Sequence, residues 1–264
     1  MGNRSFSLFL RPLLWLYNLY ALLLFIGVML LIFPFVIIAS FFNPLASGNI
    51  IYRLCMLWAD IWFLMTGIFH TNVYEAPHLK KKAYIYVTNH LSYLDAAVIV
   101  KAFRQPLRPL GKKETANVPV FGFIYKNAIV TVDRDSAADR SNSVRKLKAV
   151  LKRNISILIF PEGTLNETGN PLKSFYDGAF RIAIETQTNI KPVLFLDVYD
   201  RMPDGKVFPI YPGKTRAVFL DEVDVQGLAI TDLAILKQKV YSIMEQKLLQ
   251  YKASWIKHVS QPAE

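Results

Sequence analysis

The feature that most constrains this chain is an uncharged stretch from residue 12 to residue 52, which has no Asp, Glu, Lys or Arg over 41 positions. A helix needs about 20 apolar residues to cross a bilayer, so the stretch suits one long tilted helix or two helices broken near Pro34 or Asn43-Pro44. Signal peptides have apolar cores of only about 7–15 residues, which argues against that interpretation. The stretch therefore predicts an N-terminal membrane anchor.

Positive charges flank the uncharged stretch on both sides, because Arg4 and Arg11 precede it and Arg53 follows it. Basic flanks stay on the cytoplasmic side of a membrane, so this pattern favours a hairpin or half-buried anchor with both ends cytoplasmic. A single span is the alternative. Residues 50–69 carry Arg53 and Asp60 among apolar side chains, which predicts an interfacial helix in the headgroup zone.

The chain is strongly basic, with a formal net charge of +11 and a pI near 9.6, although 53% of its residues are hydrophobic. A basic protein of this kind binds an anionic partner, and nucleic acid and an anionic membrane surface are the two obvious candidates. The sequence contains no zinc-finger, RNA-binding or helix-turn-helix pattern, so we expect anionic lipid and no nucleic acid. The basic residues concerned are Lys80, Lys81, Lys82, Lys101, Arg104, Arg108, Lys112, Lys113, Arg140, Arg145, Lys146, Lys148, Lys152 and Arg153.

After the anchor, apolar runs of strand length alternate with segments whose apolar residues recur at helical spacing. This alternation predicts an α/β fold, a mixed sheet flanked by helices, in residues 71–264, preceded by the anchoring helical segment in residues 1–70. The expected strands are residues 83–87, 107–111, 128–132, 155–160, 191–199, 207–210 and 216–220. The expected helices are residues 93–103, 119–127, 137–153, 177–188 and 233–251.

A histidine and an aspartate, His90 and Asp95, stand in the sequence NHLSYLD at residues 89–95, between an expected strand and an expected helix. Sheets of α/β proteins expose their reactive groups at such turns. A histidine takes up a proton near neutral pH, and a carboxylate on its other ring nitrogen fixes the tautomer. The pair matches a Ser-His-Asp triad whose hydroxyl is left for a substrate to supply. The structural alternative is that Ser92 caps the helix and Asp95 closes a capping box.

Three later stretches also place functional residue types at the ends of expected strands. The sequence FPEGT at residues 160–164 leaves the strongest strand, where Pro161 ends the ladder and Gly163 lets a backbone approach a ligand. Arg134 follows another strand, and a proline-valine pair at residues 192–193 opens a further one. The ordinary alternatives are a β-turn, a surface charge and the start of an edge strand.

Together and in this order, these stretches resemble the lysophospholipid acyltransferase family, which includes the 1-acylglycerol-3-phosphate acyltransferases. That family carries Asn-His-x4-Asp, a strand ending in arginine, Phe-Pro-Glu-Gly-Thr and a Pro-Val stretch. Residues 113–114, 119–122 and 172–180 also look like the family. The resemblance spans residues 87–193.

The resemblance implies transfer of a fatty acyl group from acyl-CoA or acyl carrier protein to a lysophospholipid hydroxyl without an acyl-enzyme, in phospholipid biosynthesis. His90 would be the general base and Asp95 would orient it, at the cytoplasmic face of a membrane. No metal or other cofactor is expected, because no histidine lies at metal-ligand spacing from another histidine or cysteine. The acceptor would be bound by Arg134, Glu162, Gly163 and Thr164.

The residue after FPEGT departs from the family. Many members have arginine there, where it helps to bind the acceptor phosphate, whereas this chain has Leu165. Lys112, Lys113 and Lys173 lie in matching stretches and are expected to supply the missing charge. Lysophosphatidic acid therefore stays the expected acceptor, and a lyso-aminolipid such as a lyso-ornithine or lyso-glycine lipid is the alternative. A thioesterase and a catalytically silent membrane-binding domain are the other classes considered.

Overall fold

The computed structural model describes residues 11–79, 82–203 and 208–257, so Arg4, Lys80, Lys81 and Val207 lie outside the described part of the chain. The described residues form a seven-stranded sheet in the order β1-β7-β6-β2-β5-β3-β4. Strands β2 to β6 are parallel to their neighbours, β7 is antiparallel to β6, and β1 is parallel to β7. The strands are β1 (Ile68–Tyr74), β2 (Ile85–Thr88), β3 (Arg108–Lys112), β4 (Val130–Val132), β5 (Ile157–Ile159), β6 (Ile190–Leu196) and β7 (Gly213–Phe219).

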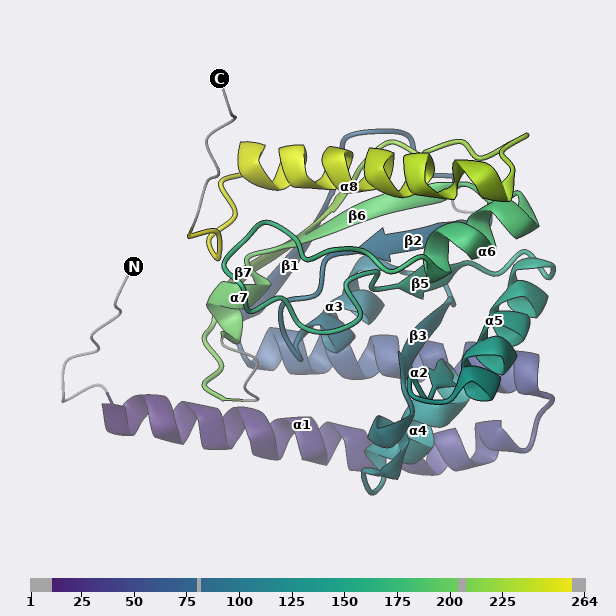
Figure 1. The fold of residues 1–264 in the computed structure, drawn as a ribbon. Coiled ribbons are helices and arrows are strands. Elements are labelled where there is room, and N and C mark those ends of the chain that lie inside the picture. The colour runs from purple at the N-terminus through teal and green to yellow at the C-terminus, as the bar shows by residue number, and fades with distance from the viewer. Residues whose placement is uncertain (1–10, 80–81, 204–207, 258–264) are drawn as a thin grey trace.

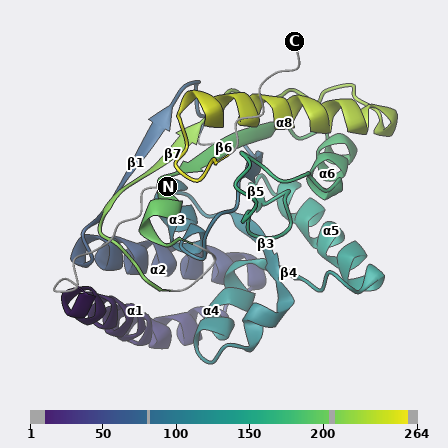
Figure 2. The ribbon, with the colours of Figure 1, turned by 60° about the vertical axis from the view of Figure 1, so that its left-hand side comes forward.

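Helices cover both faces of the sheet, which confirms the predicted α/β fold with a mixed sheet (Figures 1 and 2). The central strands β2, β5 and β6 are buried along their whole length, as expected for parallel strands with helices on both sides. The helices are α1 (Arg11–Ser40), α2 (Pro44–Met65), α3 (Asp95–Ala102), α4 (Phe121–Ala128), α5 (Ala137–Leu151), α6 (Gly178–Thr186), α7 (Val198–Arg201) and α8 (Leu233–Gln250).

The alternation of side chains around β2 separates two hydrophobic cores. Ile85 and Val87 point into a core shared with α5, α6 and α8. Tyr84 and Tyr86 point the other way, into a core shared with α2 and α3. The anchor helices therefore pack on one face of the sheet and the helices of the second half of the chain cover the other.

The uncharged stretch forms two helices, and the break lies at Asn43-Pro44 rather than at Pro34, which sits inside α1. The Asn43 side chain accepts a hydrogen bond from the backbone N–H of Ala46 (3.0 Å), and proline is tolerated in the first helical turn because its missing N–H would have no partner there. This cap explains why the chain turns at the second proline and not at the first.

Polar groups on aromatic side chains join α1 to α2. The indole of Trp62 donates to the carbonyl of Ala21 (2.9 Å) and that of Trp58 to Phe25 (3.2 Å). Since the later residue of one helix bonds the earlier residue of the other, the two helices are antiparallel, and they lie side by side along one face of the molecule (Figure 1). Among the described residues, α1 is the helix long and apolar enough to cross a membrane, with a mean hydropathy of 3.1 in a window that is 28% buried.

The charged residues of α2 do not all face outward as an interfacial helix would require. The Asp60 carboxylate binds Lys101 (2.6 Å) and Arg104 (2.7 Å) at the end of α3. These ion pairs attach α2 to the α/β part of the chain. The predicted helix over residues 50–69 also ends early, since α2 stops at Met65.

Strand β1 has no counterpart among the predicted elements. The chain turns at Gly67, whose φ of +67° favours glycine, and all seven residues of β1 then pair with β7. The predicted anchor boundary at residue 70 falls inside this strand. The apolar start of β1 follows α2 without a charged residue between them, so its sequence resembles a continuation of the helix.

Two predicted strands need correction. The strand predicted over residues 191–199 ends at Leu196, because Asp197 adopts φ +65° and α7 follows. Residues 208–212 form no strand, although a strand was expected over 207–210. Pro209 has no N–H to donate, and the backbone N–H and carbonyl of Ile210 bond the buried side chain of Asn18 instead (2.6 and 3.4 Å).

Candidate active site

The predicted site residues lie along one edge of the sheet. Strands β2, β5, β3 and β4 are neighbours and run parallel, so their carboxyl ends meet at the same edge. His90 follows β2, the FPEGT loop follows β5, Lys112 ends β3, and Arg134 follows β4. The order of strands thus decides how far each side chain lies from His90.

His90 and Asp95 are in direct contact. The imidazole Nδ1 lies 2.8 Å from Asp95 Oδ2, and since an ionised carboxylate only accepts, Nδ1 carries the proton. The same oxygen accepts hydrogen bonds from the backbone N–H groups of Leu91 (2.8 Å) and Ser92 (3.1 Å). Asp95 is fully buried, whereas 22% of the His90 side chain is exposed. The carboxylate therefore holds the ring at Nδ1 and leaves Nε2 as the nitrogen that can accept a proton.

The chemical interpretation of Asp95 fits the contacts, whereas the capping-box interpretation holds only in part. Helix α3 begins at Asp95 itself, so Ser92 is not its N-cap, and the Ser92 hydroxyl bonds Leu94 N (3.1 Å) and the Met202 carbonyl (2.8 Å). The Asp95 carboxylate nevertheless accepts from Ser92 N, which is half of a capping box. One carboxylate closes the turn and orients the imidazole.

Two residues that the sequence did not single out shape this turn. Phe160, the first residue of FPEGT, stacks on the imidazole with ring centroids 4.0 Å apart and an angle of 17°. Asn89 is buried, and its side-chain amide bonds the backbone of Phe195 in β6. Each stands before a predicted site residue in its motif, and this position is the signal that could have found both.

The Glu162 carboxylate is buried, with 1% of the residue exposed. Its Oε1 accepts from the backbone N–H of His90 (2.9 Å), and its Oε2 accepts from the backbone N–H of Lys173 (2.8 Å). Burial raises the pKa of this carboxyl to about 7, although the two N–H groups oppose the shift. The resemblance implied an acceptor contact for Glu162, whereas the structure turns its carboxylate inward.

The last two residues of FPEGT, Gly163 and Thr164, lie nearer the surface than Glu162. Gly163 has φ +75°, and a Cβ there would lie 2.6 Å from the Tyr176 ring, so only glycine fits without movement. Thr164 is exposed, and its hydroxyl accepts a hydrogen bond from the Lys173 ammonium. The structure thus brings Lys173 beside the loop in which Leu165 stands where many family members have arginine.

The remaining predicted cations lie farther along the edge. One strand separates β2 from β3 and two separate it from β4, so at about 4.8 Å per strand their ends lie roughly 10 and 14 Å from that of β2. Lys112 pairs with Glu114 (3.8 Å), and Lys113 lies near Asp133 (3.7 Å). Arg134 is exposed, and its carbonyl accepts a hydrogen bond from the Arg140 guanidinium. These cations form a second group, distinct from Lys173.

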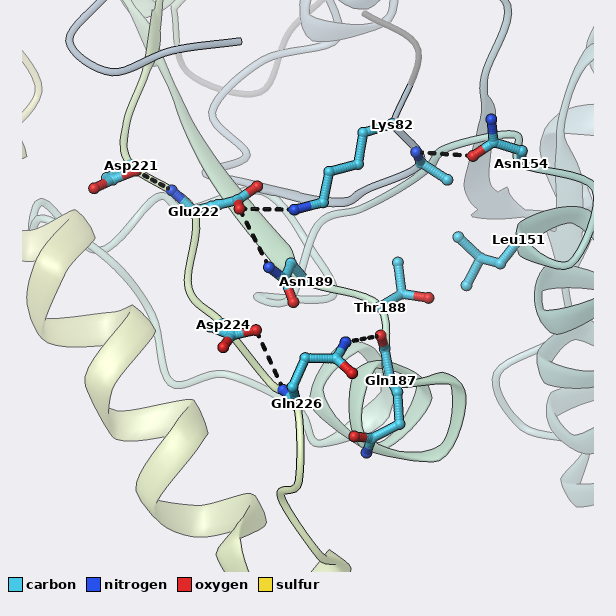
Figure 3. Close-up of a pocket in the computed structure, with 11 residues that line it drawn as sticks. Lys82, Leu151, Asn154, Gln187, Thr188, Asn189, Asp221, Glu222, Asp224 and Gln226 are labelled. Atoms are coloured by element: carbon cyan, nitrogen blue, oxygen red, sulfur yellow. Dashed lines mark hydrogen bonds and ion pairs between the residues drawn. The ribbon is translucent and has the colours of Figure 1, made fainter. Parts of the chain in front are cut away.

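A pocket of about 710 Å³ lies at the opposite edge, where β2 and β6 begin (Figure 3). Its polar groups bond one another: Glu222 accepts from Lys82 (2.7 Å) and Asn189 (3.3 Å), and the Gln226 side chain donates to the Gln187 carbonyl (2.6 Å). These contacts close the end of the sheet. The pocket is therefore separate from the edge that carries His90.

The part of the chain that carries these motifs is similar to known proteins. The profile of the family described as Acyltransferase matches residues 70–196. A putative 1-acyl-sn-glycerol-3-phosphate acyltransferase of Caenorhabditis elegans, acl-2, is 31% identical over 69% of this chain and 65% of its own length. The 1-acyl-sn-glycerol-3-phosphate acyltransferase of Escherichia coli is 28% identical over 63% of this chain and 67% of its own.

The fold is also similar to a solved structure, that of the 1-acyl-sn-glycerophosphate (LPA) acyltransferase PlsC from Thermotoga maritima. The TM-score is 0.70, with 20% sequence identity, and the alignment covers 94% of this chain and 100% of that one. By sequence, this chain spans less than two thirds of the length of the worm relative.

Proposed function

Because this chain belongs to the acyltransferase family, we propose that it transfers a fatty acyl group from an acyl thioester to the free hydroxyl of lysophosphatidic acid, giving phosphatidic acid. The observation that carries the proposal is the 2.8 Å hydrogen bond between His90 Nδ1 and Asp95 Oδ2 just after β2, where 22% of the His90 side chain is exposed. It fixes the tautomer in which Nε2 accepts a proton.

The proposed reaction is direct. His90 Nε2 takes the proton of the acceptor hydroxyl as its oxygen attacks the thioester carbonyl carbon. The tetrahedral intermediate collapses with cleavage of the carbon–sulfur bond, and the imidazolium returns its proton to the departing thiolate. The products are an ester and a free thiol. Asp95 stabilises the imidazolium between these two proton transfers.

The acceptor headgroup would meet Lys173 and Thr164 first, since these two side chains contact each other on the loop that follows β5. Arg134, with Lys112 and Lys113, would supply positive charge farther along the edge. A guanidinium and several ammonium groups suit a phosphomonoester, and the named relatives are acyltransferases of 1-acyl-sn-glycerol-3-phosphate.

The reaction would take place at a membrane surface, because the lysolipid and its product both reside in the bilayer. Support comes from the apolar side chains that α1 and the turn after it expose, among them Trp15, Leu31 and Phe41. Because basic flanks stay in the cytoplasm, an antiparallel hairpin would have both of its ends on the cytoplasmic side, and the site would lie on that side too. Single cysteines introduced at Asn3 and Arg140 should then be labelled from the same side of a sealed vesicle. Labelling from opposite sides would establish a single span.

A second acceptor class follows from Leu165. Without the guanidinium that many family members have at this position, discrimination for a phosphomonoester is weaker, which favours a lyso-aminolipid as the alternative acceptor. Lys173 lies beside this loop and offsets part of the loss, so lysophosphatidic acid stays the preferred substrate.

An acceptor panel tests the proposal. The purified full chain would be assayed with lysophosphatidic acid, lyso-aminolipids and other lysophospholipids, each with one acyl-CoA and one acyl carrier protein thioester. Phosphatidic acid as the main product supports the proposal. Free fatty acid without acceptor would indicate a thioesterase, and no turnover with any combination would indicate a silent domain.

A further inference from the structure

Resting on the proposed function, we infer that Glu162 is a positioning residue whose carboxylate ties the backbone of the His90 turn to the backbone of the Lys173 loop and does not contact the acceptor. The family resemblance pointed to an acceptor contact at this position. The contacts in the structure assign it another task.

Each oxygen of the carboxylate holds a different segment. Oε1 accepts from the N–H of His90, the residue proposed as the base, and Oε2 accepts from the N–H of Lys173, the residue proposed to meet the headgroup. His90 and Lys173 are distant in the sequence, and Glu162 joins them from the start of the loop that also carries Lys173. The base and the headgroup cation therefore keep a fixed relation through one side chain.

Burial separates Glu162 from the surface on which an acceptor would lie. The neighbouring Pro161 is buried, as are Asn166 and Leu172. An acceptor hydroxyl could reach the carboxylate only by entering this buried space, since 1% of Glu162 is exposed and both of its oxygens already face backbone N–H groups. Thr164, two residues farther on, is exposed and is the residue of this loop that suits an acceptor contact.

The Glu162 carboxylate is surrounded mostly by backbone groups, and few charged side chains face it. The titratable groups that face it are His90, Asp95 of α3, Lys173 and Tyr241 of α8. Protonation would turn one carboxyl oxygen into a donor, which weakens its contact with the N–H group that it faces. Low pH and the substitution of Glu162 by glutamine should therefore perturb the same two segments, those of His90 and Lys173.

Glu162→Gln tests the inference, because glutamine keeps the shape of the side chain but offers an NH2 group to one of the two N–H donors. The matched control is Thr164→Val, on the same loop but exposed. Steady-state kinetics with lysophosphatidic acid and an acyl-CoA would be combined with hydrogen exchange measured on peptides that contain His90 and Lys173. Both variants would be made in the full chain.

For Glu162→Gln we expect kcat to fall about 10- to 100-fold, a change in acceptor KM of less than about threefold, and faster exchange in both peptides. For Thr164→Val we expect a raised acceptor KM, little change in kcat and unchanged exchange around His90. The inference is overturned if Glu162→Gln instead raises the acceptor KM, keeps kcat and leaves both peptides as protected as in the wild type.

Two further arms keep the test decisive. If Glu162→Gln does not fold, Glu162→Asp replaces it, since its shorter carboxylate reaches one donor and should accelerate exchange in one peptide only; unchanged exchange in both would overturn the inference. If the wild type acylates no acceptor, the proposed function fails. Exchange around His90 and Lys173 then still decides whether Glu162 joins the two segments.

Discussion

The side chain of Asn89 and the backbone of Phe195 exchange two hydrogen bonds: Asn89 Nδ2 donates to the Phe195 carbonyl (3.0 Å), and Phe195 N–H donates to Asn89 Oδ1 (2.8 Å). Both groups are buried. The side chain thereby continues the pairing of β2 with β6 by one more step, at the point where the backbone of β2 turns toward His90. The residue before the proposed base thus fixes where the turn begins.

Asn89→Ala should destabilise the protein and slow the reaction. It leaves the N–H and carbonyl of Phe195 buried without partners, which costs about 1–3 kcal/mol per group. We expect a lower midpoint of thermal unfolding and a loss of kcat. Asn89→Asp is the control, since it keeps the acceptor for Phe195 N–H and loses only the donor; a stability equal to that of Asn89→Ala would contradict this account.

His90→Ala should reduce acyl transfer about 10²- to 10⁴-fold, because a positioned base is lost. Asp95→Asn should also reduce it severely while the fold persists, since the amide no longer selects the tautomer that Nε2 needs. Activity assays would be paired with circular dichroism to confirm folding. A well-folded His90→Ala protein with near-wild-type activity would exclude the proposed mechanism.

Arg134→Ala should raise the KM for lysophosphatidic acid with a smaller effect on the thioester. A charge-assisted hydrogen bond is worth about 1.5–3 kcal/mol, which corresponds to a KM about 10- to 100-fold higher. Leu165→Arg should leave activity on lysophosphatidic acid equal or improved, since it adds a guanidinium next to Thr164. If the wild type ignores lysophosphatidic acid but acylates a lyso-aminolipid, Leu165 decides the acceptor.

The contribution of Glu162 to stability should depend on pH. Because burial raises the pKa of Glu162 from 4.5 to about 7, the folded state binds a proton between these values that the unfolded state does not. Its contribution to the free energy of unfolding therefore grows as pH falls from about 7 toward 4.5. Glu162→Gln should remove this contribution, which denaturation curves at pH 5.5 and pH 8 would detect. An unchanged pH dependence would contradict the assignment.

Much of the fold follows from short-range patterns in the sequence. The buried runs at residues 155–160 and 83–87 predicted β5 and β2, because parallel strands covered on both faces need apolar residues throughout. Strand β1 was not predicted, because its partner β7 is far away in the sequence and its apolar residues follow directly on those of α2. Residues 208–212 form no strand because Ile210 bonds Asn18, which is far away in the sequence.

Part of the candidate site could likewise be predicted from the sequence, and part of it could not. A spacing of five residues does not place His90 and Asp95 on one face of a helix, and the turn between β2 and α3 brings the two groups together. Nothing in the order of FPEGT tells that Glu162 points inward while Thr164 points outward, because that depends on how loop 165–173 folds back. Lys173 reaches Thr164 for the same reason. The distances of Lys112 and Arg134 from His90 are set by the order of the strands in the sheet.

The short connection at Gly67 limits how the N-terminal helices can be removed by truncation. Trp62 and Phe63 of α2 lie in the same core as Tyr86 and Phe195, and β1 follows immediately and covers the edge of β7. A fragment of residues 71–264 would lose the start of that strand and open this core to water. Bare strand edges and large apolar patches promote aggregation, so we expect such a fragment to elute as aggregates in size-exclusion chromatography. Removal of the two apolar helices should therefore not yield a soluble protein, since α1 and α2 also contribute side chains to the core on this face of the sheet.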